Sequence, residues 1–407
     1  MSVRKITLFT LLLMLLASCD KDSTVLKVEP DVIGVGEKAR KTLLVYMMAE
    51  NSLSGYASLD VAEIVEAVPD IPRDCRMFVF VDDKGLPLLT QYFRMTNGDV
   101  GNSNTVLFNK DVCSSDTAVL GEVLDYIMDS YPTETLDLVM WSHGNGWLRT
   151  PMKSSPQRSI GIDNEENSYS NNITTTIEIE ELAALLKRLP TRVNRLMFDA
   201  CFMQCAESSY ALRDAAEWIV ASPAEIPGDG ADYSSLVPAF FSSDAPEGLI
   251  DVYIKAYSNE PSGAVLSVVS AKNMQHLADV TYAYVIKYFN VDKNRAYSDV
   301  FSYLPGGKYS GSVTYPSYFD MNAVMKKYLT EDEYTHWRKA FDLAVVYLDS
   351  SPRWYSAICG RSIIFNMSLG GGMSLYMPQS NERNATFNSD FRSTEWYSAA
   401  GWEAAGW

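Results

Sequence analysis

The most constraining feature of this sequence is an alternation, running from residue 41 to residue 222, of short apolar runs with amphipathic segments. The apolar runs are continuous, which is typical of strands covered on both faces of a sheet. Strands that alternate with helices predict βαβ units, and so a mainly parallel central sheet flanked by helices. The predicted strands are 41–49, 75–83, 136–142, 193–200 and 218–222, and the predicted helices are 52–68, 116–131, 177–189 and 202–216. The runs 86–95 and 105–109 predict a hairpin or edge strands.

The remainder of the chain follows a different pattern. Helical spacing recurs at 249–258, 275–289 and 331–349, and strand-like runs follow at 361–366 and 371–378. We expect an α/β domain over 41–245 and a mixed region over 246–407, helical at first, whose late strands return to the sheet as edge strands.

The N-terminus has the pattern of an export signal. Arg4 and Lys5 precede the apolar run 6–17, which is too short for a comfortable membrane span. The sequence "LASC", ending at Cys19, resembles the lipobox of bacterial lipoproteins. This resemblance implies a signal peptide over 1–18, lipidation of Cys19, a tether over 19–40, and a lipid-anchored location in the cell envelope, at the outer membrane or cell surface. The alternative is an ordinary secretory signal in which Cys19 is incidental.

Charge and cysteine content exclude some classes of function. The net charge of −17 argues against nucleic acid as a partner. Besides Cys19, cysteines stand at 75, 113, 201, 205 and 359, an odd and sparse set without any CxxC pair. That set fits neither a disulfide framework nor a zinc site. An odd cysteine in an exported protein is instead a candidate reactive thiol.

Two predicted strands end in residues that can do chemistry. The third strand runs into His143 and Gly144, and the fourth runs into Cys201. If the strands are neighbours, both side chains lie at one sheet edge, where sites in open α/β sheets collect. We expect Cys201 to open a helix, whose N-terminus favours the thiolate, and His143 to exchange its proton. Gly144 leaves its N–H open to a substrate carbonyl, as an oxyanion hole requires. The alternatives are a satisfied core histidine and a small buried cysteine.

Around these residues the sequence resembles the clostripain-like family of cysteine peptidases, which have a caspase-like fold. The matching stretches, in order, are "TLLVYMMAENSL", "LDLVMWSHGNGW", "SIGIDN", "FDACFMQCAE", "ASPAEIPGDGADY" and "GGMSLYMP". The resemblance implies a caspase-like sandwich and peptide hydrolysis through a thioester, with Cys201 as nucleophile and His143 as general acid and base. The N–H groups of Gly144 and Cys201 then form the oxyanion hole.

The resemblance also implies a preference for substrates with Arg or Lys before the cleaved bond. Asp199 matches the family's acidic residue near the pocket for that side chain, and Ser222, Glu225 and Asp229 belong to the same substrate-binding group. The alternative for Asp199 is a cap on the following helix, and for Glu225 and Asp229 a solvated turn. The family often has Trp where Ala231 stands here. The resemblance therefore does not predict the wall of this pocket.

The long polar insertion 147–172 is the candidate activation loop. Family members are often activated by cleavage between the histidine and the cysteine, and Arg149, Lys153 and Arg158 are basic residues in that interval. A solvated loop with incidental basic residues is the alternative. The acidic stretch 163–167 offers oxygen ligands suited to Ca²⁺, although such runs are also ordinary wet surface.

Three functions remain open at this stage. The first is a monomeric cysteine endopeptidase that acts on peptides or proteins, needs no cofactor for its chemistry and contacts the membrane only through its lipid anchor. The second is a catalytically silent surface lipoprotein that binds peptides or glycans. The third is a protein whose main act is cutting its own loop.

Overall fold

The computed structural model describes most of the chain after the tether. It covers residues 28–148, 159–163, 175–293, 297, 299–305, 307–309, 312–314, 318–366, 368–380 and 384–407. Cys19 and the predicted processing residues Arg149, Lys153 and Arg158 lie outside the described residues.

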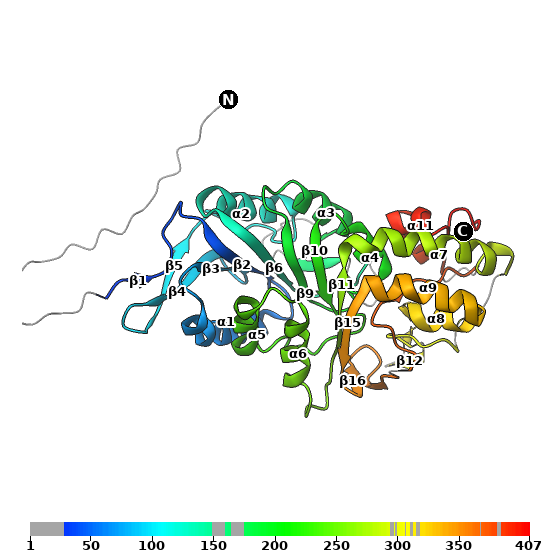
Figure 1. The fold of residues 1–407 in the computed structure, drawn as a ribbon. Helices are drawn as coiled ribbons and strands as arrows, with labels where there is room; N and C mark the ends of the chain where they lie inside the picture. Colours follow the sequence, from blue (N-terminus) through cyan, green and yellow to red (C-terminus); the bar gives the residue numbers. More distant parts are fainter. Residues whose placement is uncertain are drawn as a thin grey trace, which may run out of the picture.

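A ten-stranded sheet forms the centre of the molecule (Figure 1). Its middle consists of five parallel strands, in the spatial order β3 (Cys75–Asp82), β2 (Ala39–Met48), β6 (Thr133–Trp141), β9 (Val193–Asp199) and β10 (Ala216–Ala221). These are the five apolar runs that the sequence marked as strands. The predicted α/β class with a mainly parallel centre is therefore confirmed.

The strands of this parallel centre are buried on both faces. In β2, Leu44, Tyr46 and Met48 belong to one apolar core, and Leu43, Val45 and Met47 belong to the other. Helices α1 (Ser54–Ala67), α5 (Tyr233–Ser242) and α6 (Glu247–Ala256) cover the second core. Helices α2 (Thr117–Ser130), α3 (Ile179–Lys187) and α4 (Ala206–Ala211) lie over the first, on the opposite side of the sheet in Figure 1. Two covered faces explain why the strands are continuous apolar runs.

Antiparallel strands extend the sheet at both edges. At one edge β4 (Leu88–Met95) pairs with β3, β5 (Val100–Thr105) and β1 (Pro30–Asp31). At the other edge β11 (Val265–Ser270) pairs with β10, and β15 (Val345–Ser350) pairs with β11. The predicted hairpin is confirmed, with its second strand a few residues earlier than expected. The sheet has strands on both sides of the predicted domain boundary at 245, which itself stays a prediction.

The predicted edge strands were placed wrongly. The run 361–366 forms β17 (Arg361–Ile364), which pairs with β16 (Arg353–Ser356), and 371–378 contributes β18 (Ser374–Leu375), which pairs with β14 (Phe319–Asp320). Both are separate two-stranded ladders. The true edge strand β15 lies in the stretch 331–349 that was predicted as one helix, since α9 (Glu331–Ala344) ends where β-branched Val345 and Val346 begin. β-Branched side chains favour a pleated strand beside β11.

The remaining helices pack over the second half of the chain. They are α7 (Met274–Tyr288), α8 (Met321–Tyr328), α10 (Ala385–Arg392) and α11 (Glu395–Ala399), and their buried side chains continue the first core. Among the described residues, no helix has the length and apolar character needed to cross a membrane.

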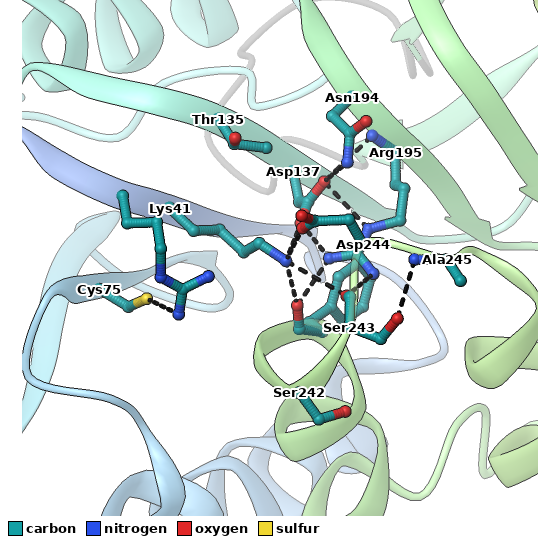
Figure 2. A network of polar contacts seen from close by, with 12 residues as sticks. Lys41, Cys75, Thr135, Asp137, Asn194, Arg195, Ser242, Ser243, Asp244 and Ala245 are labelled. Atoms are coloured by element: carbon teal, nitrogen blue, oxygen red, sulfur yellow. Dashed lines mark hydrogen bonds and ion pairs between the residues drawn. The ribbon is translucent and has the colours of Figure 1, made fainter.

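A buried cluster of charges holds α5 against the amino ends of the central strands (Figure 2). Lys41 of β2 contacts Asp244 at 2.6 Å and the carbonyl of Phe240 at 2.6 Å. Arg195 of β9 pairs with Asp137 of β6, with both side chains fully buried, and donates to the carbonyl of Phe240 at 2.6 Å. Cations at a helix C-terminus satisfy its last carbonyls. The cluster therefore fixes the far end of a helix whose first residue, Tyr233, reaches the candidate site described next.

Candidate active site

The two strands that end in candidate catalytic residues are neighbours. β6 and β9 run parallel, with Trp141 paired to Asp199 at their carboxyl ends. His143 and Cys201 each follow just beyond these strand ends. The prediction that the two segments meet at one sheet edge is confirmed for the strands that carry them.

The two glycines after His143 allow its segment to pack tightly against the turn that begins at Cys201. A Cβ on Gly144 would lie 2.7 Å from the Cys201 carbonyl oxygen, and a Cβ on Gly146 would lie 2.8 Å from that of Phe202. Gly146 also has a φ of +61°, which glycine adopts without strain. The sequence predicted that Gly144 leaves room for a substrate carbonyl. The structure adds a second reason, which is close packing of backbone on backbone.

His143 is half-buried and contacts a neighbouring loop. Its Nε2 lies 2.8 Å from Oγ of Ser52, in the segment that joins β2 to α1. Burial lowers the pKa of His143 below its usual 6.5, because an imidazolium loses hydration there. The ring is therefore neutral at pH 7 and able to accept a proton. Ser52 was not identified from the sequence, and no pattern in the sequence distinguishes it from other loop serines.

The Ser52 loop is itself braced by its neighbour. The side chain of Asn51 donates to the carbonyls of Met48 and Ile162, each at 2.8 Å, and accepts from the N–H of Leu53 at 2.8 Å. The loop is thus tied to the end of β2 and to β7 (Ile160–Asp163), which holds the Ser52 hydroxyl in place beside the imidazole.

Cys201 does not open a helix, which corrects the prediction. It lies in a turn after β9 that includes Phe202 at a φ of +61°, and α4 begins only at Ala206. The half-buried thiol contacts residue 226, whose N–H lies 3.4 Å from Sγ. Burial raises the pKa of Cys201 to about 12, and the charges of Glu225 and Asp199 add to the rise. The thiol is therefore protonated at pH 7 and needs a base at the moment of attack.

A second segment fixes the cysteine turn from the other side. Phe202 and Gln204 donate their N–H groups to the carbonyls of Ala224 and Ser222, both at 2.9 Å. The Ser222 hydroxyl is fully buried and bonded within its own turn, donating to the Ala224 carbonyl at 3.0 Å. The predicted substrate-binding residue Ser222 therefore holds the shape of the turn that braces the cysteine segment.

Glu225 and Asp229 differ in their surroundings. Glu225 is buried, accepting from the Ser356 hydroxyl and, at 3.0 Å, from the Ile358 N–H. Both carboxylate oxygens thus attach the β16–β17 hairpin to the segment beside Cys201. The solvated-turn alternative is wrong for Glu225 but describes Asp229, whose side chain is exposed.

Asp199 is buried at the end of β9 and surrounded by hydrogen-bond donors. Its carboxylate accepts from the Ala231 N–H and the Tyr233 hydroxyl, each at 3.1 Å, and from the Tyr253 hydroxyl at 3.2 Å. A Cβ on Gly230 would lie 2.8 Å from Oδ2 of Asp199, so this glycine leaves the carboxylate room. The helix-cap alternative is wrong, because these partners all lie beyond residue 230. Burial raises the pKa of Asp199 despite the three donors.

A further carboxylate near Asp199 was missed. Asp60 of α1 is buried and accepts from the Trp141 indole N–H at 2.7 Å. Burial, helped by the charge of Asp199, raises the pKa of Asp60 to about 8. Helical spacing could have predicted that Asp60 is buried, because it lies on the same face of α1 as the buried Ala57 and Ile64.

Part of the predicted activation loop, 147–172, is held to the fold. Ser159 donates its N–H to the Leu148 carbonyl at 2.9 Å, and Asn145 donates to the Ser159 carbonyl at 2.8 Å. Leu148 and Ser159 are both buried. Leu148 and Ser159, on either side of Arg149, Lys153 and Arg158, therefore lie side by side, two residues along the chain from Gly146.

An acidic cluster lies at the same sheet edge. Carboxylate oxygens of Glu50, Asp82 and Asp111 come within 4.8 Å of one another, at the carboxyl ends of β2 and β3 and in the segment before α2. The calcium candidates predicted from the sequence were instead at 163–167. Of that stretch only Asp163 is described, and it is buried, with Oδ2 accepting from the Ser114 N–H at 2.6 Å.

Comparison with known proteins decides the family. A model described as the clostripain family matches residues 45–407. The chain belongs to the clostripain family. No match was found among curated proteins. Among solved structures, an inactive zymogen C11 protease from Parabacteroides distasonis has 25% identity and a TM-score of 0.74, covering 89% of this chain and 98% of its own.

Two further structures are similar to this clostripain-family chain. A secreted C11 cysteine protease from Bacteroides thetaiotaomicron, in complex with an irreversible peptide inhibitor, has 25% identity and a TM-score of 0.72, over 89% of this chain and 99% of its own. A B. fragilis cysteine protease has 29% identity and a TM-score of 0.51, over 59% of this chain and 99% of its own. The expected caspase-like fold is confirmed. This clostripain-family protein is a cysteine peptidase that acts on peptide or protein substrates.

Proposed function

We propose that this peptidase is an endopeptidase that cleaves through a Cys201/His143 dyad and a thioester intermediate. The observation that carries the proposal is the placement of a neutral imidazole and a protonated thiol just beyond the ends of two adjacent parallel strands. Because a preformed thiolate is disfavoured by burial, the thiol proton passes to His143 as sulfur attacks.

His143 moves one proton in each half of the reaction. Sγ of Cys201 bonds to the scissile carbonyl carbon while its proton moves to His143, and the carbonyl oxygen becomes an oxyanion. The C–N bond then breaks, and His143 gives the proton to the leaving amine. Water attacks the thioester, His143 takes the water proton, and the departing thiolate regains it. The Gly144 N–H has no partner among the described residues, which supports it, together with the Cys201 N–H, as an oxyanion donor.

We further propose that the peptidase prefers Arg or Lys before the cleaved bond. Asp199 and Asp60 place two buried carboxyl groups beside the cysteine strand. A basic side chain relieves the cost of burying their charge, whereas a neutral side chain does not. Exposed Asp229 lies on the turn that covers Asp199 and is suited to attract the same cation.

The same proposal includes activation by loop cleavage and a lipid anchor. Cleavage after Arg149, Lys153 or Arg158 would leave both new ends attached at the paired residues Leu148 and Ser159. The P. distasonis protease was solved as an inactive zymogen, which supports a similar precursor here.

We also propose that Cys19 carries a lipid that anchors a monomeric enzyme in the cell envelope, and that the chemistry itself needs no cofactor. Mass spectrometry of the membrane fraction, with Cys19→Ala as control, tests the anchor.

One experiment tests the activity. The protein and its Cys201→Ala variant are assayed on fluorogenic peptides ending in Arg, Lys, Asp or Ala, with Cys113→Ala as a matched control at another half-buried cysteine. Activity that needs only Cys201 and prefers Arg or Lys supports both parts of the proposal. Activity with another preference contradicts the proposed binding of a basic side chain near Asp199 but still supports the dyad. Equal inertness of all three proteins, with a single band on a denaturing gel, favours the silent binding protein. Loop cleavage without peptide turnover favours a protein that cuts only itself.

A further inference from the structure

Tyr318 is a fully buried residue that contacts both of the segments that carry the dyad. It lies directly before β14. Its hydroxyl donates to the main-chain carbonyl of Asn145 at 2.9 Å and also faces the side-chain oxygen of that residue. Its ring stacks on Phe202, with centroids 4.3 Å apart and an angle of 15° between the planes. Asn145 is two residues from His143, and Phe202 follows Cys201 directly. One side chain therefore connects the histidine segment to the cysteine turn.

The hydroxyl end of Tyr318 holds the histidine segment. Burial raises the pKa of Tyr318 well above its usual 10, because a phenolate would lose its hydration there. The hydroxyl therefore keeps its proton and remains a donor to Asn145. A Cβ on Gly146 would lie 3.6 Å from the Tyr318 ring, so the ring also packs along the backbone of this segment. Tyr318 thus contacts the segment at two residues that follow His143 closely.

The ring end of Tyr318 supports a strained residue in the cysteine turn. Phe202 has a φ of +61°, and in the part of the chain that the structure describes it is the only residue other than glycine with a positive φ. Such a conformation persists only where the surrounding contacts enforce it. The stacked ring of Tyr318 is one of these contacts, and the bond from the Phe202 N–H to the Ala224 carbonyl at 2.9 Å is another. If Phe202 relaxed to an ordinary conformation, Cys201 would move with it, because the two residues share a peptide bond.

The ladder that begins after Tyr318 belongs to the region 246–407 and is attached to the cysteine turn. β14 pairs with β18, and Ser374 of β18 donates its N–H to the Gln204 carbonyl at 3.0 Å. The Tyr318 carbonyl accepts from the Tyr303 N–H at 2.8 Å. Tyr318 is therefore fixed through its own backbone, and its side chain is presented to the dyad from a firm support.

We propose that Tyr318 is a positioning residue that holds His143 and Cys201 at their reaction distance. Its hydroxyl acts through Asn145 on the histidine segment, and its ring acts through Phe202 on the cysteine segment. The inference rests on the proposed dyad, in which one proton moves between Sγ and the imidazole. A small separation of the two groups slows that step, whereas the substrate contacts that determine KM are unaffected.

Two substitutions of Tyr318 separate its two contacts. Tyr318→Phe keeps the ring and removes the hydroxyl, and we expect kcat to fall about 5- to 20-fold with KM within about twofold of the parent. Tyr318→Leu also removes the stack, and kcat should fall at least about tenfold further. Tyr376→Phe is the matched control, because Tyr376 is also fully buried and its hydroxyl donates to Asn388 of α10 at 2.9 Å. This control should lower the unfolding midpoint about as much as Tyr318→Phe and leave kcat unchanged.

The reactivity of the thiol reports the same geometry without a substrate. The rate at which iodoacetamide alkylates Cys201 is followed by mass spectrometry, because alkylation requires loss of the thiol proton and a well-placed imidazole accepts it. At pH 7, Tyr318→Phe should slow this reaction at least about threefold relative to the parent. Alkylation of Cys113, a half-buried thiol elsewhere in the same protein, should keep its rate.

The outcomes distinguish failure of this inference from failure of the dyad. Activity that needs Cys201 but is unchanged in both Tyr318 variants overturns the inference alone, and so does a fall in kcat that is as large in Tyr376→Phe as in Tyr318→Phe. Activity that survives Cys201→Ala contradicts the dyad and the inference together. If Tyr318→Leu fails to fold, Phe202→Leu removes the stack from the other side and must lower kcat at unchanged KM.

Discussion

Replacing Gly144 by alanine tests whether tight packing between the histidine and cysteine segments sets the reaction geometry. The new Cβ would lie 2.7 Å from the Cys201 carbonyl oxygen, 2.9 Å from Cβ of Ala200 and 2.9 Å from Sδ of Met203. Unstrained carbon atoms lie about 3.5 Å apart, so the two segments must separate by roughly 0.6 Å. Two of the three obstacles are backbone or Cβ atoms, which cannot swing away as a long side chain can.

Such a displacement acts directly on the distance between Sγ and the imidazole. Because a misplacement of about 1 Å costs roughly 10²-fold in rate, we expect Gly144→Ala to lower kcat/KM about 10- to 100-fold. Overpacking should also lower the free energy of unfolding by about 1–3 kcal/mol. Both are measured with a fluorogenic peptide and by chemical denaturation. Gly248→Ala is the matched control, because a Cβ there meets nothing within 4 Å. A Gly144→Ala enzyme with kcat/KM within twofold of the parent would refute this account.

Three further predictions concern the support of the site. Ser52→Ala should lower kcat several-fold with little change in KM or in the unfolding midpoint, because it removes only the contact with His143; a change confined to KM would contradict this. Since burial lowers the pKa of His143 below 6.5 and the reaction needs the neutral ring, protonation of this ring should lower kcat/KM only below pH 6.5. Folding stability should likewise drop as acid forces a proton onto the buried ring, and an acid limb of kcat/KM centred above pH 7 would count against the assignment. Arg195→Met should cost about 3–5 kcal/mol by removing the closest cation of buried Asp137 and leaving it only Lys41 at 3.7 Å, whereas Arg192→Met, at an exposed ion pair, should cost about 1 kcal/mol or less; equal losses by denaturation would contradict the packing argument.

The sequence predicted the centre of the sheet but not its far edge, and the reason is local. Each central strand is an apolar run bounded by polar residues, so periodicity alone identifies it. At the junction of α9 and β15, by contrast, no glycine or proline separates helix from strand. The helical pattern through Phe341 continues smoothly into Val345. Only pairing with β11 decides in favour of a strand, and β11 itself was not recognised in the run 265–270.

The candidate site, too, was predicted from the sequence only in part. Strand order explains why His143 and Cys201 could be placed together, because both follow strand ends that parallel pairing brings to one edge. The surroundings of each residue depend on contacts far along the chain. Asp199 receives its hydrogen bonds from residues 231, 233 and 253, and no local pattern links those positions. The expected helix after Cys201 was wrong because the turn through Phe202 delays helix formation until Ala206.

The electrostatics of the sheet edge bear on the proposed substrate preference. His143 is held neutral and Cys201 protonated, so the dyad contributes no cation to compensate the buried acids around it. Burial raises the pKa of Asp60 to about 8 and that of Asp199 above its usual value. Near pH 7 the charge of Asp60 is therefore neutralised either by a proton or by a cation. Under the proposed preference, a basic substrate side chain supplies that cation near Asp199 and Asp60. Its binding should therefore release protons at pH 7, and a neutral substrate side chain would forgo that gain.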